Sequence, residues 1–344
     1  MRKIDGSQGE GGGSILRLAS ALALINEEKV KIENIRKKRP TPGLRPQHLL
    51  GLQALTEMCG GELIGGAVGS ESIIFHPGSQ WESHIHIKIP TAGSIGLVLQ
   101  TLQLGILAKR KHELTIVFQG GATFGKWAPS LPYIMNVTWD IFKRLGYEFE
   151  VEIDQHGFFP KGGALVKVKM KSPSDLHGIN LERDETISKA RVISIATDHL
   201  SRTKVAERQG EEIRNRLNKE SIEAELNTHY VKATNPGSGV LVYSKTGNTI
   251  IAGDAVGEKR KSAEIVGRVA LKHYLSTLNT QSCVDGFLAD QILPILALAK
   301  NSSCFTTPKI TNHTFTNIEL VKHFMRVDIT TEKQIQNYIV SIDC

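Results

Sequence analysis

The hydrophobic and polar positions of this chain change period several times along its length. Apolar residues recur at helical spacing over residues 14–25 and 47–58, and they alternate over residues 30–35 between those two stretches. Two short alternating segments follow, at residues 62–64 and 72–75, after a Cys59-Gly60-Gly61 stop. This order predicts helices layered on a small sheet.

The same order of elements recurs twice more, although the residues themselves differ. The second copy has predicted strands and helices at residues 85–89, 92–108, 114–118, 133–145, 149–153 and 165–169. The third copy is shorter, with helices at residues 288–299 and 317–324 and strands at 327–329 and 338–342. We therefore expect an α+β fold made of repeated units.

A stretch with its own elements separates the second and third copies. It combines strands with two helices, at residues 204–217 and 262–275, and the first of these helices is rich in charge. That charge is typical of a solvated helix face. The predicted organisation is a core over residues 1–183, an inserted α/β domain over 184–279, and the remaining core over 280–344.

Composition narrows the class of protein only slightly. The 344 residues include 42 Lys and Arg against 35 Asp and Glu, a net charge of +7 that would attract a polyanion without identifying it. No leader-like segment and no membrane-length apolar run is present, so a cytoplasmic location is the expectation. The 4 cysteines are widely spaced, which argues against a zinc ribbon or a disulfide framework.

A glycine run next to a carboxylate is the first candidate site. Glu10 precedes three glycines, and a predicted helix begins at Ser14, so backbone N–H groups could face an anion there. The spacing matches neither a Walker A loop nor a dinucleotide fingerprint. A tight turn explains the glycines equally well, but a carboxylate beside a phosphate site favours a bridging Mg²⁺ or Mn²⁺ ion with Glu10 as its ligand.

A proline-stiffened basic loop is the second candidate. Arg36, Arg39 and Arg45 lie in it with two lysines, and Gln47 and His48 follow at the start of a helix. Guanidinium groups suit phosphate binding because their donors form a planar fork. A solvated basic loop or a localisation signal remains the alternative.

Three further segments could line a binding pocket. Gln100 follows a Thr-Ala-Gly-Ser turn, and Pro129 lies near Trp127 after a glycine pair. Residues 287–291 place acidic and amide groups at the start of an apolar helix, where they could contact a ribose or a base. Core packing and helix capping explain the same residues. His313 falls between a strand and a helix, at the place where the earlier copies carry their candidate loops.

Taken together, five motifs resemble the RNA 3′-terminal phosphate cyclase family. The motifs are EGGGSILR at residues 10–17, PGLRPQHL at 42–49, TAGS with Gln100, LADQILP at 288–294 and HTFTNI at 313–318. Further agreement at residues 156–163 and 237–257 extends the resemblance over nearly the whole chain.

The resemblance implies βαβαββ units like those of the C-terminal domain of translation initiation factor three, an architecture shared with enolpyruvyl transferases. It implies ATP as a substrate, His313 as the residue that forms a covalent adduct with AMP, and an RNA 3′-phosphate that is converted to a 2′,3′-cyclic phosphate. Glu10 matches the metal position. Positions that match the RNA-phosphate or nucleotide contacts are Arg17, Arg36, Arg39 and Gln47. Positions that match the ATP pocket are Gln100, Pro129, Phe287, Leu288, Ala289, Asp290 and Gln291.

Some positions depart from the family pattern. Lys37-Lys38 replace a small pair, Phe287 stands where tyrosine is common, Pro132 replaces an aspartate and Ala164 ends a usual triple glycine. Two alternatives stay open: a cyclase-like binding factor for ribosome assembly that lacks catalysis, and an enolpyruvyl-transferase-like enzyme. The oligomeric state is also open, with a homodimer among the options.

Overall fold

The first unit begins the chain and sets the pattern for the other two. The structure is a computed structural model that describes residues 1–183 and 186–344. The elements of the first unit are β1 (Arg2–Asp5), α1 (Gly13–Ile25), β2 (Val30–Glu33), α2 (Pro46–Cys59), β3 (Glu62–Ile64) and β4 (Ile73–His76). The strands pair in the order β1-β2-β4-β3, with β1 parallel to β2 and the other pairs antiparallel. This is a βαβαββ unit.

The second unit repeats this topology with longer strands. Its elements are β5 (His84–Ser94), α3 (Ile95–Gly105), the 3-10 turn η1 (Ile106–Ala108), β6 (Glu113–Ala122), α4 (Leu131–Tyr133), the π-helical turn η2 (Ile134–Thr138), α5 (Trp139–Arg144), β7 (Glu148–Gln155) and β8 (Leu165–Lys171). The sheet order β5-β6-β8-β7 matches that of the first unit.

The third unit is divided by the inserted domain. Its elements are β9 (Asn180–Leu181), α8 (Gly286–Leu296), β14 (Ser303–Thr307), α9 (Asn312–Phe324), β15 (Asp328–Lys333) and β16 (Tyr338–Asp343). The short strand β9 pairs parallel with β14, so the sheet order β9-β14-β16-β15 again matches the other units. We did not predict β9, because two residues are too few for a hydrophobic period to show.

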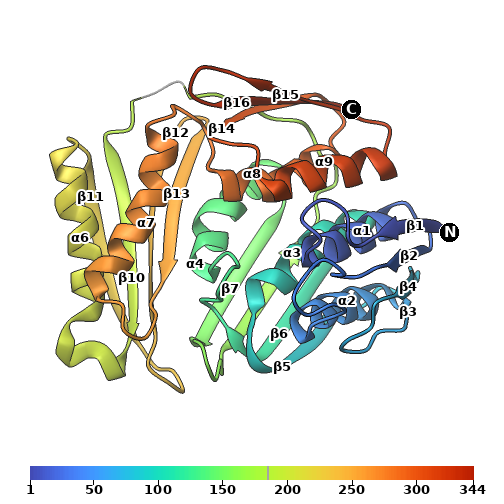
Figure 1. The fold of residues 1–344 in the computed structure, drawn as a ribbon, viewed down its shortest axis with the longest axis horizontal. Helices are drawn as coiled ribbons and strands as arrows, with labels where there is room; N and C mark the ends of the chain where they lie inside the picture. The colour runs from blue at the N-terminus through green and yellow to red at the C-terminus, as the bar shows by residue number, and fades with distance from the viewer. Residues whose placement is uncertain (184–185) are drawn as a thin grey trace.

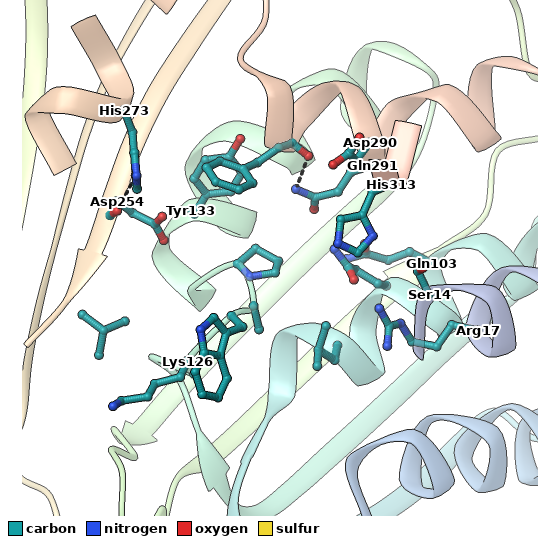
Figure 2. Close-up of a pocket in the computed structure, with 18 of the residues that line it drawn as sticks. Ser14, Arg17, Gln103, Lys126, Tyr133, Asp254, His273, Asp290, Gln291 and His313 are labelled. Atoms are coloured by element: carbon teal, nitrogen blue, oxygen red, sulfur yellow. Dashed lines mark hydrogen bonds between the residues drawn. The ribbon is translucent and has the colours of Figure 1, made fainter. Parts of the chain in front are cut away.

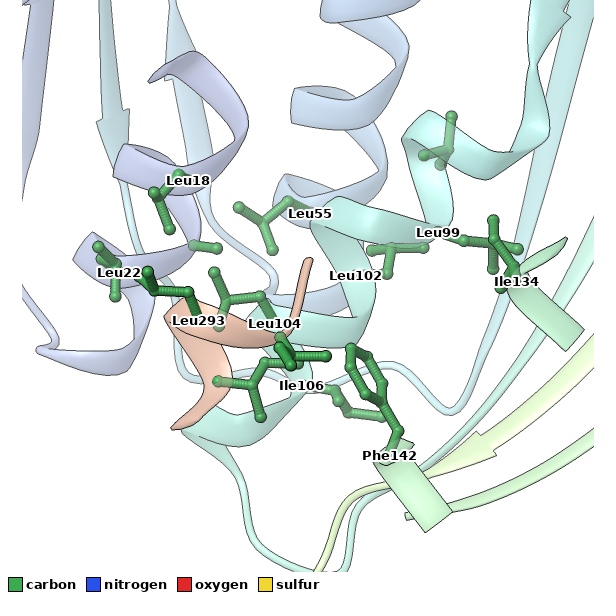
Figure 3. Close-up of a cluster of buried hydrophobic side chains, with 14 of the residues drawn as sticks. Leu18, Leu22, Leu55, Leu99, Leu102, Leu104, Ile106, Ile134, Phe142 and Leu293 are labelled. Atoms are coloured by element: carbon green, nitrogen blue, oxygen red, sulfur yellow. The ribbon is translucent and has the colours of Figure 1, made fainter. Parts of the chain in front are cut away.

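Helices occupy the interior and the sheets form the outside of the core. Figure 1 shows α8 and α9 lying between the sheet of the third unit and the helices of the first two, and α1 contacts both α3 and α9. Leucines from several units fill the space between the helices (Figure 3), including Leu22, Leu55, Leu102 and Leu293, which are fully buried. The N-termini of α1, α3 and α8, the helices that follow the first strand of each unit, therefore lie near one another.

The inserted domain has a sheet with two helices on one face. Its elements are β10 (Lys189–Thr197), the 3-10 turn η3 (Asp198–Thr203), α6 (Val205–Lys219), β11 (Glu223–Val231), β12 (Ser238–Thr246), β13 (Thr249–Val256) and α7 (Ala263–Leu278). On β12, Val240 and Val242 join the hydrophobic cluster of this domain, whereas Leu241 and Tyr243 belong to the cluster of the core. Both faces of this strand are buried, so the domain packs firmly against the core.

The predicted α+β fold class is confirmed, while several element boundaries differ. The helix predicted to start at residue 92 begins at Ile95, because β5 continues to Ser94 and the Ser94 side chain caps the helix by accepting from the Leu97 N–H at 3.3 Å. The helix predicted from residue 317 begins at Asn312, so His313 is helical. The predicted domain boundary at 184 falls on residues 184–185, outside the described residues. No helix in the described ranges is long and apolar enough to cross a membrane.

Candidate active site

Glu10 and His313 meet where the first and third units join. Glu10 lies in the turn between β1 and α1, and His313 is the second residue of α9. His313 Nε2 is 3.0 Å from Glu10 Oε2, with the histidine side chain 48% exposed and the glutamate side chain only 10% exposed. The contact is an ion pair when the imidazole is protonated.

The loop that carries Glu10 is fixed by contacts with α9 and by its glycines. Thr316 Oγ1 accepts from the Glu10 N–H at 3.2 Å and donates to the Asn312 carbonyl at 2.6 Å. Ser14 Oγ donates to Glu10 Oε1 at 2.8 Å. A Cβ atom on Gly12 would displace the Glu10 carboxylate, so glycine at this position leaves room for the carboxylate where it lies. These contacts position the carboxylate relative to the histidine.

Arginines surround this pair and give the site a positive charge. Arg39 Nη2 donates to the Glu10 carbonyl at 2.7 Å. Burial lowers the pKa of Arg17 to about 10, which leaves it charged at neutral pH. The Nε atom of Arg36 is buried without a hydrogen-bond partner among the described residues. Burial and nearby arginines lower the pKa of His48 to about 3, so His48 stays neutral. The cluster suits an anion with several oxygens.

A cavity of about 690 Å³ extends from this cluster to the inserted domain. Figure 2 shows His313 and Arg17 toward one side of it and His273 and Asp254 toward the other. The volume is within the range of small-molecule sites. The predicted residues that line it are Arg17, Gln100, Pro129, Phe287, Asp290, Gln291 and His313.

Phe287 is presented to the cavity by the capped start of α8. Asp285 accepts from the Phe287 and Leu288 N–H groups at 2.9 and 3.0 Å, and the buried Tyr133 hydroxyl lies 2.9 Å from both of its oxygens. Burial raises the pKa of Asp285 to about 6. The Phe287 ring is 49% exposed and meets the His273 ring edge-on, with 5.6 Å between centroids. One of its faces is therefore free for another flat group.

The polar groups one turn further along α8 already have protein partners. Asp290 Oδ1 accepts from the Thr311 and Thr314 hydroxyls at 2.8 and 2.5 Å, and burial raises its pKa. Gln291 donates to the backbone carbonyl four residues earlier at 3.0 Å and accepts from Thr138 at 3.1 Å. Either side chain would have to share or exchange these bonds to contact a ligand.

Not every predicted site residue reaches the cavity. Leu288 and Ala289 are fully buried in the core, on the part of α8 that packs inward. Gln47 is exposed at the start of α2, and Arg36 lies in the arginine cluster but not on the cavity wall. Residues 287–291 thus include both cavity-lining and core positions, because successive residues of a helix point to different sides of it.

The inserted domain supplies one wall of the cavity, which we did not predict. Asp254, Glu258, Lys261 and His273 all line it, and Lys126 of the core pairs with Glu258 at 2.7 Å. The one available signal was the order of elements along the chain: the inserted stretch ends directly before the helix that opens the third copy, so it must lead back to the start of that helix. Here the helix is α8, which begins at the cavity.

The residues around Glu10 suit a metal that arrives with a substrate. No group of three or more His, Cys, Asp or Glu side chains occurs within residues 1–183 and 186–344 that could hold an ion by itself. Glu10 offers one carboxylate, with the Ser14 hydroxyl beside it. Mg²⁺ is often bound by one or two carboxylates, with phosphate oxygens and water completing its shell.

Comparison with known proteins agrees with the motifs. Residues 8–331 match the family described as RNA 3′-terminal phosphate cyclase. A protein of that name from Pyrococcus furiosus is 40% identical over 93% of this chain and 92% of its own length. The namesake from Archaeoglobus fulgidus is 37% identical over 94% of this chain and 96% of its own length. A solved EPSP synthase from Acinetobacter baumannii aligns over 94% of this chain and 61% of its own, with 14% identity and a TM-score of 0.27, too low to indicate a shared fold. The chain belongs to the RNA 3′-terminal phosphate cyclase family.

Proposed function

We propose that this chain is an enzyme that uses ATP to convert an RNA 3′-phosphate into a 2′,3′-cyclic phosphate, with His313 as the nucleophile. The observation that carries the proposal is the pairing of His313 Nε2 with Glu10 at 3.0 Å, beside an arginine cluster and at one end of a nucleotide-sized cavity. Family membership supports the overall reaction, and the geometry supports the roles of individual residues.

In the first step, His313 Nε2 attacks the α-phosphorus of ATP. A phosphorus–nitrogen bond forms, the bond to the β-phosphate oxygen breaks, and pyrophosphate leaves. Nε2 attacks through its lone pair and must therefore be unprotonated, and the nearby Glu10 carboxylate stabilises the positive charge that the ring gains as the bond forms. Arg17 and Arg39 are placed to offset the phosphate charge. A divalent cation held by Glu10 would supply further charge neutralisation at the phosphates.

The nucleoside of ATP would occupy the middle of the cavity. Phe287 presents a ring that is about half exposed, and Pro129 and Gln100 line the same space. Phe287 lacks the hydroxyl of the tyrosine that the family pattern favours, so its contribution is stacking alone. The edge-on contact with His273 holds the Phe287 ring in place.

In the second and third steps, the adenylate moves to RNA and the ring closes. An oxygen of the RNA 3′-phosphate attacks the phosphorus of the adduct, which releases His313. The adjacent 2′-hydroxyl then attacks the activated 3′-phosphorus, and AMP leaves while the hydroxyl proton passes to solvent or a base. Proximity favours this closure, because the two reacting groups are on one ribose. RNA is required, since DNA has no 2′-hydroxyl.

The experiment is to incubate the protein with ATP labelled at the α-phosphate and to measure protein-bound label. We expect an acid-labile, alkali-stable adduct in the wild-type chain and none in His313→Ala. The matched control is His323→Ala, an exposed histidine later on the same helix, which should keep full labelling. Labelling of His313→Ala would refute the nucleophile. A wild-type chain that takes no label but binds RNA would favour the non-catalytic binding factor.

A further inference from the structure

Two exposed aromatic side chains lie at the rim of the cavity, where core and inserted domain meet. Trp127 is 97% exposed and Phe159 is 60% exposed. Trp127 adopts a φ of 55°, a left-handed conformation that is unfavourable for a bulky residue. Burial normally stabilises a tryptophan, yet here a strained backbone holds the indole in water. Packing therefore gives no reason for this arrangement.

The two rings belong to one surface and are not scattered apolar residues. The segments that carry them run side by side, because Phe124 and Phe158 form a bridge and stack with centroids 5.4 Å apart. Lys126 lies between them: its Nζ atom is 5.4 Å from the centre of the Phe159 ring, and it is the chain neighbour of Trp127. We call Lys126, Trp127, Phe159, Lys161 and residues 258–261 the rim patch.

Positive charge accompanies the rings. Glu258 pairs with both Lys126 and Lys261, and these contacts lower its pKa to about 2, so it stays ionised. The exposed Lys161, Lys259 and Arg260 have no ion pair among the described residues. The rim patch thus contains one carboxylate and five cations. Four residues of the rim patch also line the cavity that ends at His313: Lys126, Trp127, Glu258 and Lys261.

Exposed rings with cations close to them are the usual features of a surface for single-stranded nucleic acid. Each base offers a flat face for stacking, and the backbone phosphates attract the cations. Aromatic rings beside cations also occur at protein interfaces and at membrane surfaces. The rim patch, however, is continuous with the cavity that ends at His313, where the proposed RNA would have its 3′ end, and this continuity favours RNA.

We propose that the rim patch binds the unpaired nucleotides just upstream of the RNA 3′ end, with Trp127 and Phe159 stacking on bases and the 258–261 loop of the inserted domain contacting their phosphates. This rests on the proposed function for the identity of the strand. It gives the inserted domain a role, which is to guide the substrate strand toward the cavity.

The test measures binding, so that it does not depend on catalysis. A ten-nucleotide RNA with a 5′ dye and a 3′-phosphate is titrated with the full chain, and anisotropy gives the dissociation constant. Its matched probe has abasic positions in place of the bases upstream of the terminal nucleotide. Phe159→Ala should weaken binding of the normal RNA by about 5- to 150-fold, the range for loss of one base–aromatic stack. Binding of the abasic RNA should change little.

Controls separate this proposal from loss of fold and from failure of the proposed reaction. Ile335→Ala removes an even more exposed apolar side chain, 98% exposed in the β15–β16 turn, and should leave both affinities unchanged. Phe159→Ala should still form the adduct with labelled ATP, because Phe159 lies outside the cavity. If the wild-type chain forms no adduct, the reaction fails but the binding comparison still stands.

Two outcomes would overturn the proposal. Equal weakening for normal and abasic RNA would mean that charge, not stacking, is responsible. Unchanged binding in Phe159→Ala would mean that RNA does not cross the patch, and a protein partner would then be the remaining occupant. As a second variant, Lys259→Glu with Arg260→Glu should weaken binding of both RNAs and make both affinities less dependent on salt, because cations that contact phosphates have been removed.

Discussion

Asp285 joins the second and third units, and its substitution tests how the start of α8 is held. It caps the helix through two backbone N–H groups and accepts from Tyr133, which lies 152 residues away in the chain. Asparagine caps helices about as well as aspartate and can still accept from these donors. Asp285→Asn should therefore keep the contacts and remove only the buried charge. Asp285→Ala should remove both.

The size of the effect follows from the pKa of Asp285, which burial raises from 3.8 to about 6. The folded chain holds this proton more tightly than the unfolded chain, so the charge destabilises the fold as pH rises through the window from about 4 to 6. Relative to wild type, Asp285→Asn should gain free energy of unfolding, from about 1 kcal/mol at pH 4.5 to about 3 kcal/mol at pH 7.5. Asp285→Ala should be about 2 to 4 kcal/mol less stable than Asp285→Asn at both pH values, from the lost cap and the orphaned Tyr133 hydroxyl.

The assay is guanidinium unfolding of the three proteins at pH 4.5 and 7.5. Subtracting the free energy of unfolding of wild type from that of the variant at each pH cancels the contribution of the ionisable groups that both proteins share. If wild type and Asp285→Asn differ by the same amount at the two pH values, Asp285 is ionised in the folded chain as readily as in water, and the reasoning fails. If Asp285→Ala matches Asp285→Asn, the cap and the tyrosine contact contribute nothing.

Two further predictions concern the chemistry. Arg39→Ala should reduce adduct formation less than RNA cyclisation, because Arg39 is 41% exposed and can meet the incoming RNA phosphate. Parallel assays of the adduct and of the cyclic product check this, and an equal loss of both would contradict it. Glu10→Ala should raise the divalent metal concentration needed for adduct formation several-fold, because the carboxylate offered to the cation is gone, and an unchanged metal titration would count against that role.

Local patterns in the sequence were enough to predict most helices and strands. Periodicity located α1, α2 and the strands of the second unit to within a few residues. The recurring order of elements also predicted that the loop at residues 36–45, the loop at residues 120–133 and His313 face one cleft, and Pro129, Tyr133 and His313 do line one cavity. The family motifs added the chemistry, which no spacing argument could supply.

Contacts between distant segments could not be predicted from those patterns. The strand β9 spans two residues, and its place in the third sheet depends on β14 across the whole inserted domain. Nothing in residues 254–273 signals a cavity wall, because their apolar pattern is satisfied by the inserted domain itself. The π-helical turn η2 is set by how its helix fits against α8 and β13, which is tertiary packing.

The split third unit also governs when the site can form during synthesis. The turn that carries Glu10 is translated first, yet its contact partner Thr316 follows 306 residues later. At typical elongation rates of roughly 5–20 residues per second, the first two units wait on the order of tens of seconds for α9. The strand β9 waits for β14 in the same way, while the inserted domain can fold in between. A nascent or truncated chain that lacks α9 also lacks His313, so under the proposed mechanism it would form no adduct with AMP.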